Sequence, residues 1–162
     1  DKGHKEIGFI GGTDRNIDTE QSSMDIREWS FRQSASYYHC LEEDFILISD
    51  KFTVADGYRM GKKLLQKKKL PTALCVASDT LAVGVLQALN EQRIQIPEQI
   101  AVFSINDVAI ARYLSPPLTT MHIDIPTICE TALDLLRNRV LNGCRVTRSV
   151  FVNGIPKIRK ST

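Results

Sequence analysis

The fold is decided by the stretch Thr72-Ala73-Leu74-Cys75-Val76-Ala77-Ser78-Asp79-Thr80-Leu81-Ala82-Val83-Gly84-Val85-Leu86. Its first six residues form a nearly continuous apolar run, which is typical of a strand buried inside a parallel sheet. From Leu81 onwards the apolar residues recur at helical spacing, so an amphipathic helix is predicted to begin near Thr80. A strand that leads directly into a helix is the repeating unit of α/β folds.

The same alternation of strand and helix continues on both sides of this stretch, without a hairpin signal between the early strands. It predicts an α/β fold with a parallel sheet flanked by helices on both faces. Pro116-Pro117 and Asn142-Gly143 mark turns, and the tail 149–158 is predicted to hold one or two strands. The remaining predicted strands are 7–10, 45–48, 100–105 and 118–124, and the remaining predicted helices are 24–38, 54–67 and 125–141.

Composition excludes several classes of protein. The 162 residues suit one domain or one large piece of a domain, and 21 basic against 19 acidic side chains give no electrostatic reason to expect direct binding to nucleic acid. The lysines between Lys62 and Lys69 are expected on the solvated face of a helix. No apolar run approaches a membrane span and the first residues resemble no signal peptide, so a soluble cytoplasmic protein is expected.

Metal and catalytic sites are not indicated by the motifs. The four cysteines form no C-x-x-C pair, and none has a histidine at metal-ligand spacing, so neither a metal nor another cofactor is expected. The three histidines, His4, His39 and His122, show no spacing that ties them to a nucleophile. The sequence also lacks a nucleophile elbow, a P-loop and a dinucleotide fingerprint, and we therefore expect that the chain is not an enzyme.

Polar residues follow several predicted strands, at the places where open parallel sheets bind their ligands. These places are Gly11 to Asp14 with Asp25 and Arg27 further on, then Ser49-Asp50, Ser78-Asp79 and Asn106-Asp107. Each has an ordinary alternative. Ser78 and Asp79 can simply cap the next helix, and Arg27 can form a surface ion pair of little energetic value.

Four linked motifs resemble the effector-binding core of bacterial LacI/GalR transcriptional regulators. They are Val76-Ala77-Ser78-Asp79-Thr80-Leu81-Ala82-Val83-Gly84, Ile96-Pro97-Glu98-Gln99-Ile100-Ala101-Val102, Asn106-Asp107 and Ser115-Pro116-Pro117-Leu118-Thr119-Thr120. The segment Asp25-Ile26-Arg27-Glu28-Trp29-Ser30-Phe31 is similar to the family's sugar-binding arginine segment, in the form found in regulators for galactosides and related sugars. The resemblance covers almost the whole chain and implies the C-terminal subdomain of a periplasmic-binding-protein-like fold.

The resemblance implies where an effector, a sugar or sugar phosphate, would bind. Arg27 would hydrogen-bond its hydroxyls, and the implied site also includes Asp25, Ser78, Asp79 and Asn106. Ser30 replaces the family's usual glycine, Asn106 stands where many members have aspartate, and Ser78 where many have asparagine. These departures leave the identity of the sugar open.

The resemblance also implies a homodimer and a division of the chain. The implied dimer contacts are Leu81, Val83, Val85, Tyr113 and Leu114, although inward-facing residues of that helix have ordinary core packing as their alternative. Residues 1–124 and 154–162 would belong to the C-terminal subdomain, and 125–153 would pack in an N-terminal subdomain that lies outside this chain.

Operator DNA would be bound through a helix-turn-helix that also lies outside this chain. The apolar stripe of 125–141 is therefore expected to dock on a neighbouring molecule or to stay partly disordered. A transport-type periplasmic sugar-binding protein and a small α/β enzyme are the alternative functions.

Overall fold

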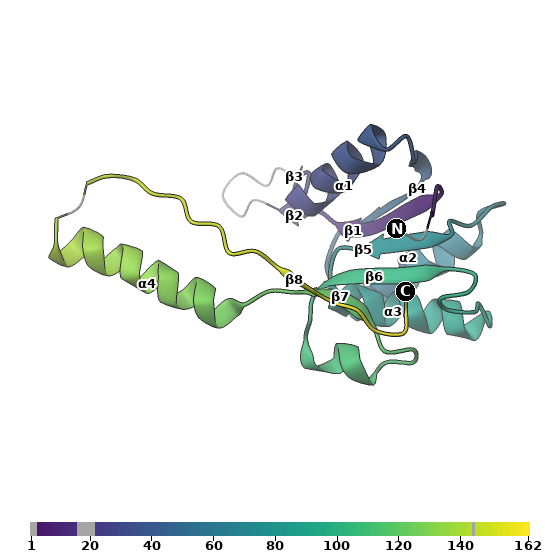
Figure 1. Cartoon of the computed structure of the whole chain (residues 1–162). Helices are drawn as coiled ribbons and strands as arrows, with labels where there is room; N and C mark the ends of the chain where they lie inside the picture. Colours follow the sequence, from purple (N-terminus) through teal and green to yellow (C-terminus); the bar gives the residue numbers. More distant parts are fainter. Residues whose placement is uncertain (1–2, 16–21, 144) are drawn as a thin grey trace.

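The computed structural model describes residues 3–15, 22–143 and 145–162, which form a mostly parallel α/β body and a projecting arm (Figure 1). The main sheet has the strand order β4-β1-β5-β6-β7-β8, in which only β8 is antiparallel to its neighbour. Its strands are β1 (Ile7–Gly12), β4 (Leu41–Ser49), β5 (Ala73–Val76), β6 (Ala101–Asn106), β7 (Thr119–His122) and β8 (Ile155–Lys157). The short strands β2 (Asp14–Arg15) and β3 (Ser22–Ser23) pair separately, and the helices are α1 (Ile26–Tyr37), α2 (Val54–Leu65), α3 (Asp79–Glu91), η1 (Ala109–Tyr113) and α4 (Ile125–Leu141).

Helices cover both faces of the sheet, which confirms the predicted fold class. Successive residues of a strand point to opposite faces. Ile10 accordingly lies in the core that α2 and α3 form with the sheet, whereas Phe9 stacks on Phe31 of α1 with ring centroids 5.0 Å apart. The coverage is uneven, because a hollow of about 240 Å³ remains open over β5 and β6, with Cys75 and Phe103 among its lining residues.

Glycines let α2 and α3 approach each other closely. A Cβ added to Gly57 would lie 2.0 Å from the carbonyl oxygen of Leu81, and one added to Gly84 would lie 2.0 Å from the carbonyl oxygen of Val54. Only a residue without a side chain fits such an approach of two backbones. The close contact explains why Leu81 and Val85 are completely buried.

The arm consists of α4 and the segment 145–153 that follows it. Asp124 caps α4, where it accepts a hydrogen bond from the backbone N–H of Thr127 at 3.1 Å, and Pro126 occupies the first turn. No residue of α4 is buried, and Figure 1 shows the helix extending away from the body. The predicted helix 125–141 is confirmed, and its apolar side chains, Leu133, Leu136 and Val140 among them, are exposed.

The structure differs from the expected elements mainly in loops and in the tail. The expected strand pattern in the tail reduces to β8, since 145–154 form no strand. The 3-10 helix η1 follows β6, where the sequence predicted no element. In the described part of the chain, no helix is long and apolar enough to cross a membrane.

Candidate functional site

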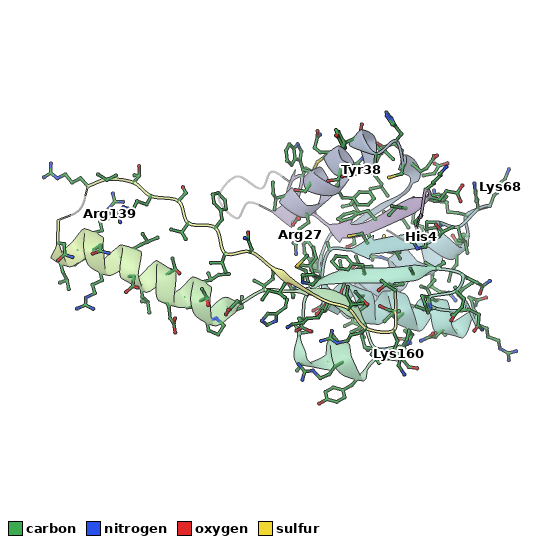
Figure 2. The ribbon with its side chains drawn as sticks, viewed as in Figure 1. His4, Arg27, Tyr38, Lys68, Arg139 and Lys160 are labelled. Carbon is green, nitrogen blue, oxygen red and sulfur yellow. The ribbon has the colours of Figure 1, made fainter. Side chains whose placement is uncertain are left out.

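Arg27 lies at the start of α1, at the edge of the body that faces the arm (Figure 2). Asp25 is the N-cap of α1 and accepts hydrogen bonds from the Arg27 guanidinium with both carboxylate oxygens. Nε of Arg27 donates to Oδ1 at 2.8 Å, and Nη2 donates to Oδ2 at 2.6 Å. Nη1 donates to the carbonyl oxygen of Ala77 at 3.0 Å, beyond the end of β5. Arg27 is therefore held in one orientation across two strand ends, while 30% of its side chain stays exposed.

Asp25 acts in this geometry as the holder of Arg27. Its side chain is buried, and the hydrogen bonds from Arg27 keep the pKa of its carboxyl below the usual range although burial opposes ionisation. The ion pair that the sequence left as a surface alternative is thus a partly buried, two-point clamp.

Phe52 is a site residue that the sequence analysis missed. The Arg27 guanidinium lies 4.6 Å from the centroid of its ring, in a cation–π contact. Phe52 follows the Ser49-Asp50 strand end and precedes Thr53, the N-cap of α2. The sequence signal that could have identified Phe52 as a site residue is its position, as an aromatic residue between the end of a strand and the cap of a helix.

Ser78 and Asp79 are buried and have structural roles, which corrects their prediction as effector contacts. Ser78 caps α3 by accepting a hydrogen bond from the backbone N–H of Leu81 at 3.3 Å. Asp79 is completely enclosed and accepts from the Ser104 and Thr120 hydroxyls and from the Val108 backbone N–H. Its carboxylate binds the elements around the end of β6 together, so it is not available to a ligand.

Asn106 and Asp107 form a sharp turn at the end of β6. Both have positive φ, 122° and 56°, a region that residues other than glycine rarely adopt. Thr120 links this turn to Asp79, because its Oγ1 accepts from the Asp107 N–H at 3.3 Å and donates to Asp79 at 2.7 Å. Asn106 is exposed at this end of the sheet, as expected for a residue that meets a ligand.

Asp107 has charged partners that the sequence did not connect. Its carboxylate lies 2.5 Å from Arg159 Nη2 and 3.1 Å from His122 Nδ1. Burial favours its neutral form, but Arg159 and His122 hold the pKa of this carboxyl below its ordinary value. Asp107 thereby connects the end of β6 to β7 and to the residues after β8.

The expected dimer residues fall into two groups. Leu81 and Val85 are fully buried against α2, so the prediction that they face a partner chain is wrong. Helical spacing identifies an apolar face but not the element that covers it. Tyr113 is 79% exposed, and Val83 and Leu114 are half-buried, so these three remain accessible.

The groups brought together at this site are suited to binding a polar ligand. It presents a fixed guanidinium, an aromatic ring and an exposed amide at neighbouring strand ends. Among the described residues, no group of three or more histidine, cysteine, aspartate or glutamate side chains is placed to hold a metal ion.

Comparison with known proteins gives a uniform picture. The model of the periplasmic binding protein-like domain matches residues 1–162. The chain is 44% identical to the HTH-type transcriptional regulator GanR of Bacillus subtilis, covering 99% of this chain and 49% of that protein, and 35% identical to the HTH-type transcriptional regulator GalR of Lacticaseibacillus casei, covering 91% and 45%. A solved sugar-binding LacI-family regulator of Escherichia coli, in complex with phosphate, superposes with a TM-score of 0.80 at 28% identity, covering 99% of this chain and 55% of that one.

These relatives confirm the resemblance to LacI/GalR regulators that the motifs indicated. They are transcriptional regulators and not enzymes. The chain spans about half the length of the curated relatives it matches. Because the family model matches the chain from end to end, the chain belongs to the periplasmic binding protein-like domain family.

Proposed function

We propose that this chain is the effector-sensing and dimerisation region of a DNA-binding transcriptional repressor of carbohydrate metabolism. The observation that carries the proposal is the Arg27 guanidinium, clamped by Asp25 above the Phe52 ring at the carboxyl ends of the strands. The curated relatives described above are HTH-type transcriptional regulators, which favours this function over sugar transport.

The proposed effector is a sugar or a sugar phosphate. A guanidinium supplies donors for hydroxyl or phosphate oxygens, the Asn106 amide supplies both a donor and an acceptor, and Phe52 offers an apolar face to the C–H groups of a sugar ring. Asp25 positions Arg27, while Asp79 and Ser78 support the strand ends from within the body. Galactosides are the proposed class, since the segment Asp25-Ile26-Arg27-Glu28-Trp29-Ser30-Phe31 is similar to the form found in regulators for galactosides and related sugars.

Residues 1–124 and 154–162 are proposed to form one half of the binding cleft, and 125–153 to belong to the other half. Effector binding would then change the relative orientation of the two halves in the whole protein, and so its affinity for operator DNA. The helix-turn-helix that binds DNA is proposed to lie outside this chain, and the cytoplasm is the proposed location. A half-site binds weakly, so we expect dissociation constants of about 1 mM or weaker for this chain alone.

The dimer is proposed to form through η1 and the accessible side of α3. Tyr113 and Ile110 of η1 expose 79% and 53% of their surface. Leu114 follows η1 directly, and Val83 lies half-buried on α3. Aromatic and aliphatic side chains of this kind are enriched in the cores of protein interfaces.

The fluorescence of Trp29 provides the test, because this single tryptophan lies on α1 two residues after Arg27. We expect galactose and galactosides to change the emission in a saturable way at millimolar concentration. Arg27→Lys should weaken the response about tenfold or more, because lysine lacks the planar fork that Asp25 clamps. Arg93→Lys, on the exposed turn after α3, is the matched control and should respond as the wild type does. Equal responses of wild type and Arg27→Lys would contradict the proposed site.

A further inference from the structure

The turn that presents Asn106 has a strained backbone. Asn106 and Asp107 have φ angles of 122° and 56°, and residues other than glycine keep such conformations only where surrounding contacts hold them. Asn106 is exposed at the end of β6, whereas the side chain of Asp107 is only 6% exposed. The position of Asn106 therefore depends on the contacts that hold Asp107.

Asp107 is held by a residue from the far end of the chain. Arg159 Nη2 donates a charge-assisted hydrogen bond to Asp107 Oδ1 at 2.5 Å. The other carboxylate oxygen lies 3.1 Å from His122 Nδ1, and the Asp107 backbone N–H donates to Thr120 Oγ1 at 3.3 Å. Arg159 makes the shortest of these three contacts, and its guanidinium is charged at every ordinary pH.

Arg159 is itself fixed from two directions. Its backbone N–H donates to Thr119 Oγ1 at 2.8 Å, and its Nη1 donates to the Leu118 carbonyl oxygen at 2.7 Å. Only 17% of its side chain is exposed. The guanidinium thus binds Asp107 and the residue before β7 at the same time, a planar arrangement that the single point charge of a lysine does not reproduce.

Arg159 belongs to the segment 155–162, which returns from the arm to the body and which we call the returning segment. The chain passes from β7 through α4 and comes back in β8, and Arg159 lies two residues after the end of β8. The segment is anchored in the body, because the Ser161 hydroxyl donates to the Val102 carbonyl oxygen at 2.6 Å and accepts from the Thr119 N–H at 2.8 Å. Support for the turn after β6 thus comes from residues that follow the arm.

We propose that Arg159 is a positioning residue of the effector site, which through Asp107 fixes the turn that holds Asn106 in place for an effector hydroxyl. This inference rests on the function proposed above, in which Asn106 contacts the sugar. Arg159 acts through Asp107 and does not itself contact the effector. The half-site is then complete only when the returning segment is docked on the body.

NMR relaxation of the whole chain tests the proposal at the turn itself. We expect backbone order parameters of about 0.85 at Asn106 and Asp107 in the wild type, and of about 0.6 or lower in Arg159→Met, which removes the hydrogen bonds and keeps an unbranched side chain. Arg159→Lys keeps the charge without the planar fork and should give values in between. Lys157→Met, at an exposed position of β8, is the matched control and should leave the turn as rigid as in the wild type.

The galactose affinity of the same variants separates a positioning role from a purely structural one. The dissociation constant for galactose, measured from chemical shifts, should rise about two- to tenfold in Arg159→Met, the range for one lost hydrogen bond. It should stay unchanged in Lys157→Met. Wild-type shifts in β1 and β4 would show that a variant is folded, and if Arg159→Met does not fold, Arg159→Lys decides by the same two measurements.

Two results would overturn the proposal. One is a turn that is as rigid in Arg159→Met as in the wild type, and the other is a mobile turn with unchanged galactose affinity. A wild-type chain without saturable galactose binding would contradict the proposed function instead. In that case the order parameters, which need no effector, still decide whether Arg159 holds the turn of Asn106.

Discussion

Replacing Gly84 by alanine should destabilise the whole body, because α2 and α3 pack backbone against backbone at this position. The new Cβ would lie 2.0 Å from the Val54 carbonyl oxygen and 2.4 Å from the Tyr58 nitrogen. To reach an ordinary contact distance of 3.4 Å, the two backbones must move apart by about 1.4 Å at this position, which loosens the packing around Leu81 and Val85. Overpacking at the upper end of its usual range costs about 3 kcal/mol, and the better helix propensity of alanine returns about 1 kcal/mol.

The expected net loss in the free energy of unfolding is thus about 2 kcal/mol. Urea unfolding followed by circular dichroism measures it, with Gln87→Ala on the exposed side of α3 as the matched control. Gln87→Ala should remain within about 0.5 kcal/mol of the wild type. A Gly84→Ala variant that is as stable as the wild type, or more stable, would show that helix propensity dominates and that the helices are not in close contact.

Three further predictions concern the clamp, the buried carboxylate and the dimer. Asp79→Asn places an amide N–H₂ group next to the donors of Ser104, Val108 and Thr120, and should lower the free energy of unfolding in urea by about 2 to 3 kcal/mol. The control Asp50→Asn, at an exposed position, should lower it little. Because the pKa of Asp25 is lowered in the folded state, its ion pair with Arg27 stabilises the fold at pH values above the pKa of an unfolded aspartate, about 3.9, and this stabilisation is lost as the pH falls through the lowered pKa. In an acid titration, Asp25→Asn should lack this loss of stability. A variant with the same acid unfolding profile as the wild type would count against the ion pair. Tyr113→Ser should weaken self-association about tenfold or more in sedimentation equilibrium, and unchanged association would exclude η1 from the interface.

The sequence was sufficient to predict the fold class, because the patterns that indicate strands and helices lie within short stretches of the chain. The central strands β1 and β5 are apolar along their length, and each α-helix begins at a side chain that caps it, Thr53, Ser78 and Asp124 among them. The same periodicity cannot identify the neighbour of a helix face. The family resemblance implied dimer contacts at Leu81 and Val85, and the apolar spacing of the helix could not decide between those contacts and core packing. The glycines Gly57 and Gly84 carried the missing information, since they mark where another backbone approaches.

The candidate site was only partly predictable. Arg27, Asp25 and Asn106 follow from strand ends and family resemblance, but the burial of Asp79 depends on three donors that come from distant parts of the chain. Phe52 and the contacts of Asp107 with His122 and Arg159 likewise join residues far apart in sequence. No local pattern reports such contacts, because the sheet topology creates them.

Chemical-shift mapping by NMR during a galactose titration tests most directly the claim that the strand ends around Arg27 form half of a sugar site. We predict weak binding, with a dissociation constant of about 1 mM or higher, and shift changes that centre on Arg27, Phe52 and Asn106. Arg27→Lys should remove most of these changes. Micromolar affinity for this chain alone, or shift changes that centre elsewhere, would contradict it.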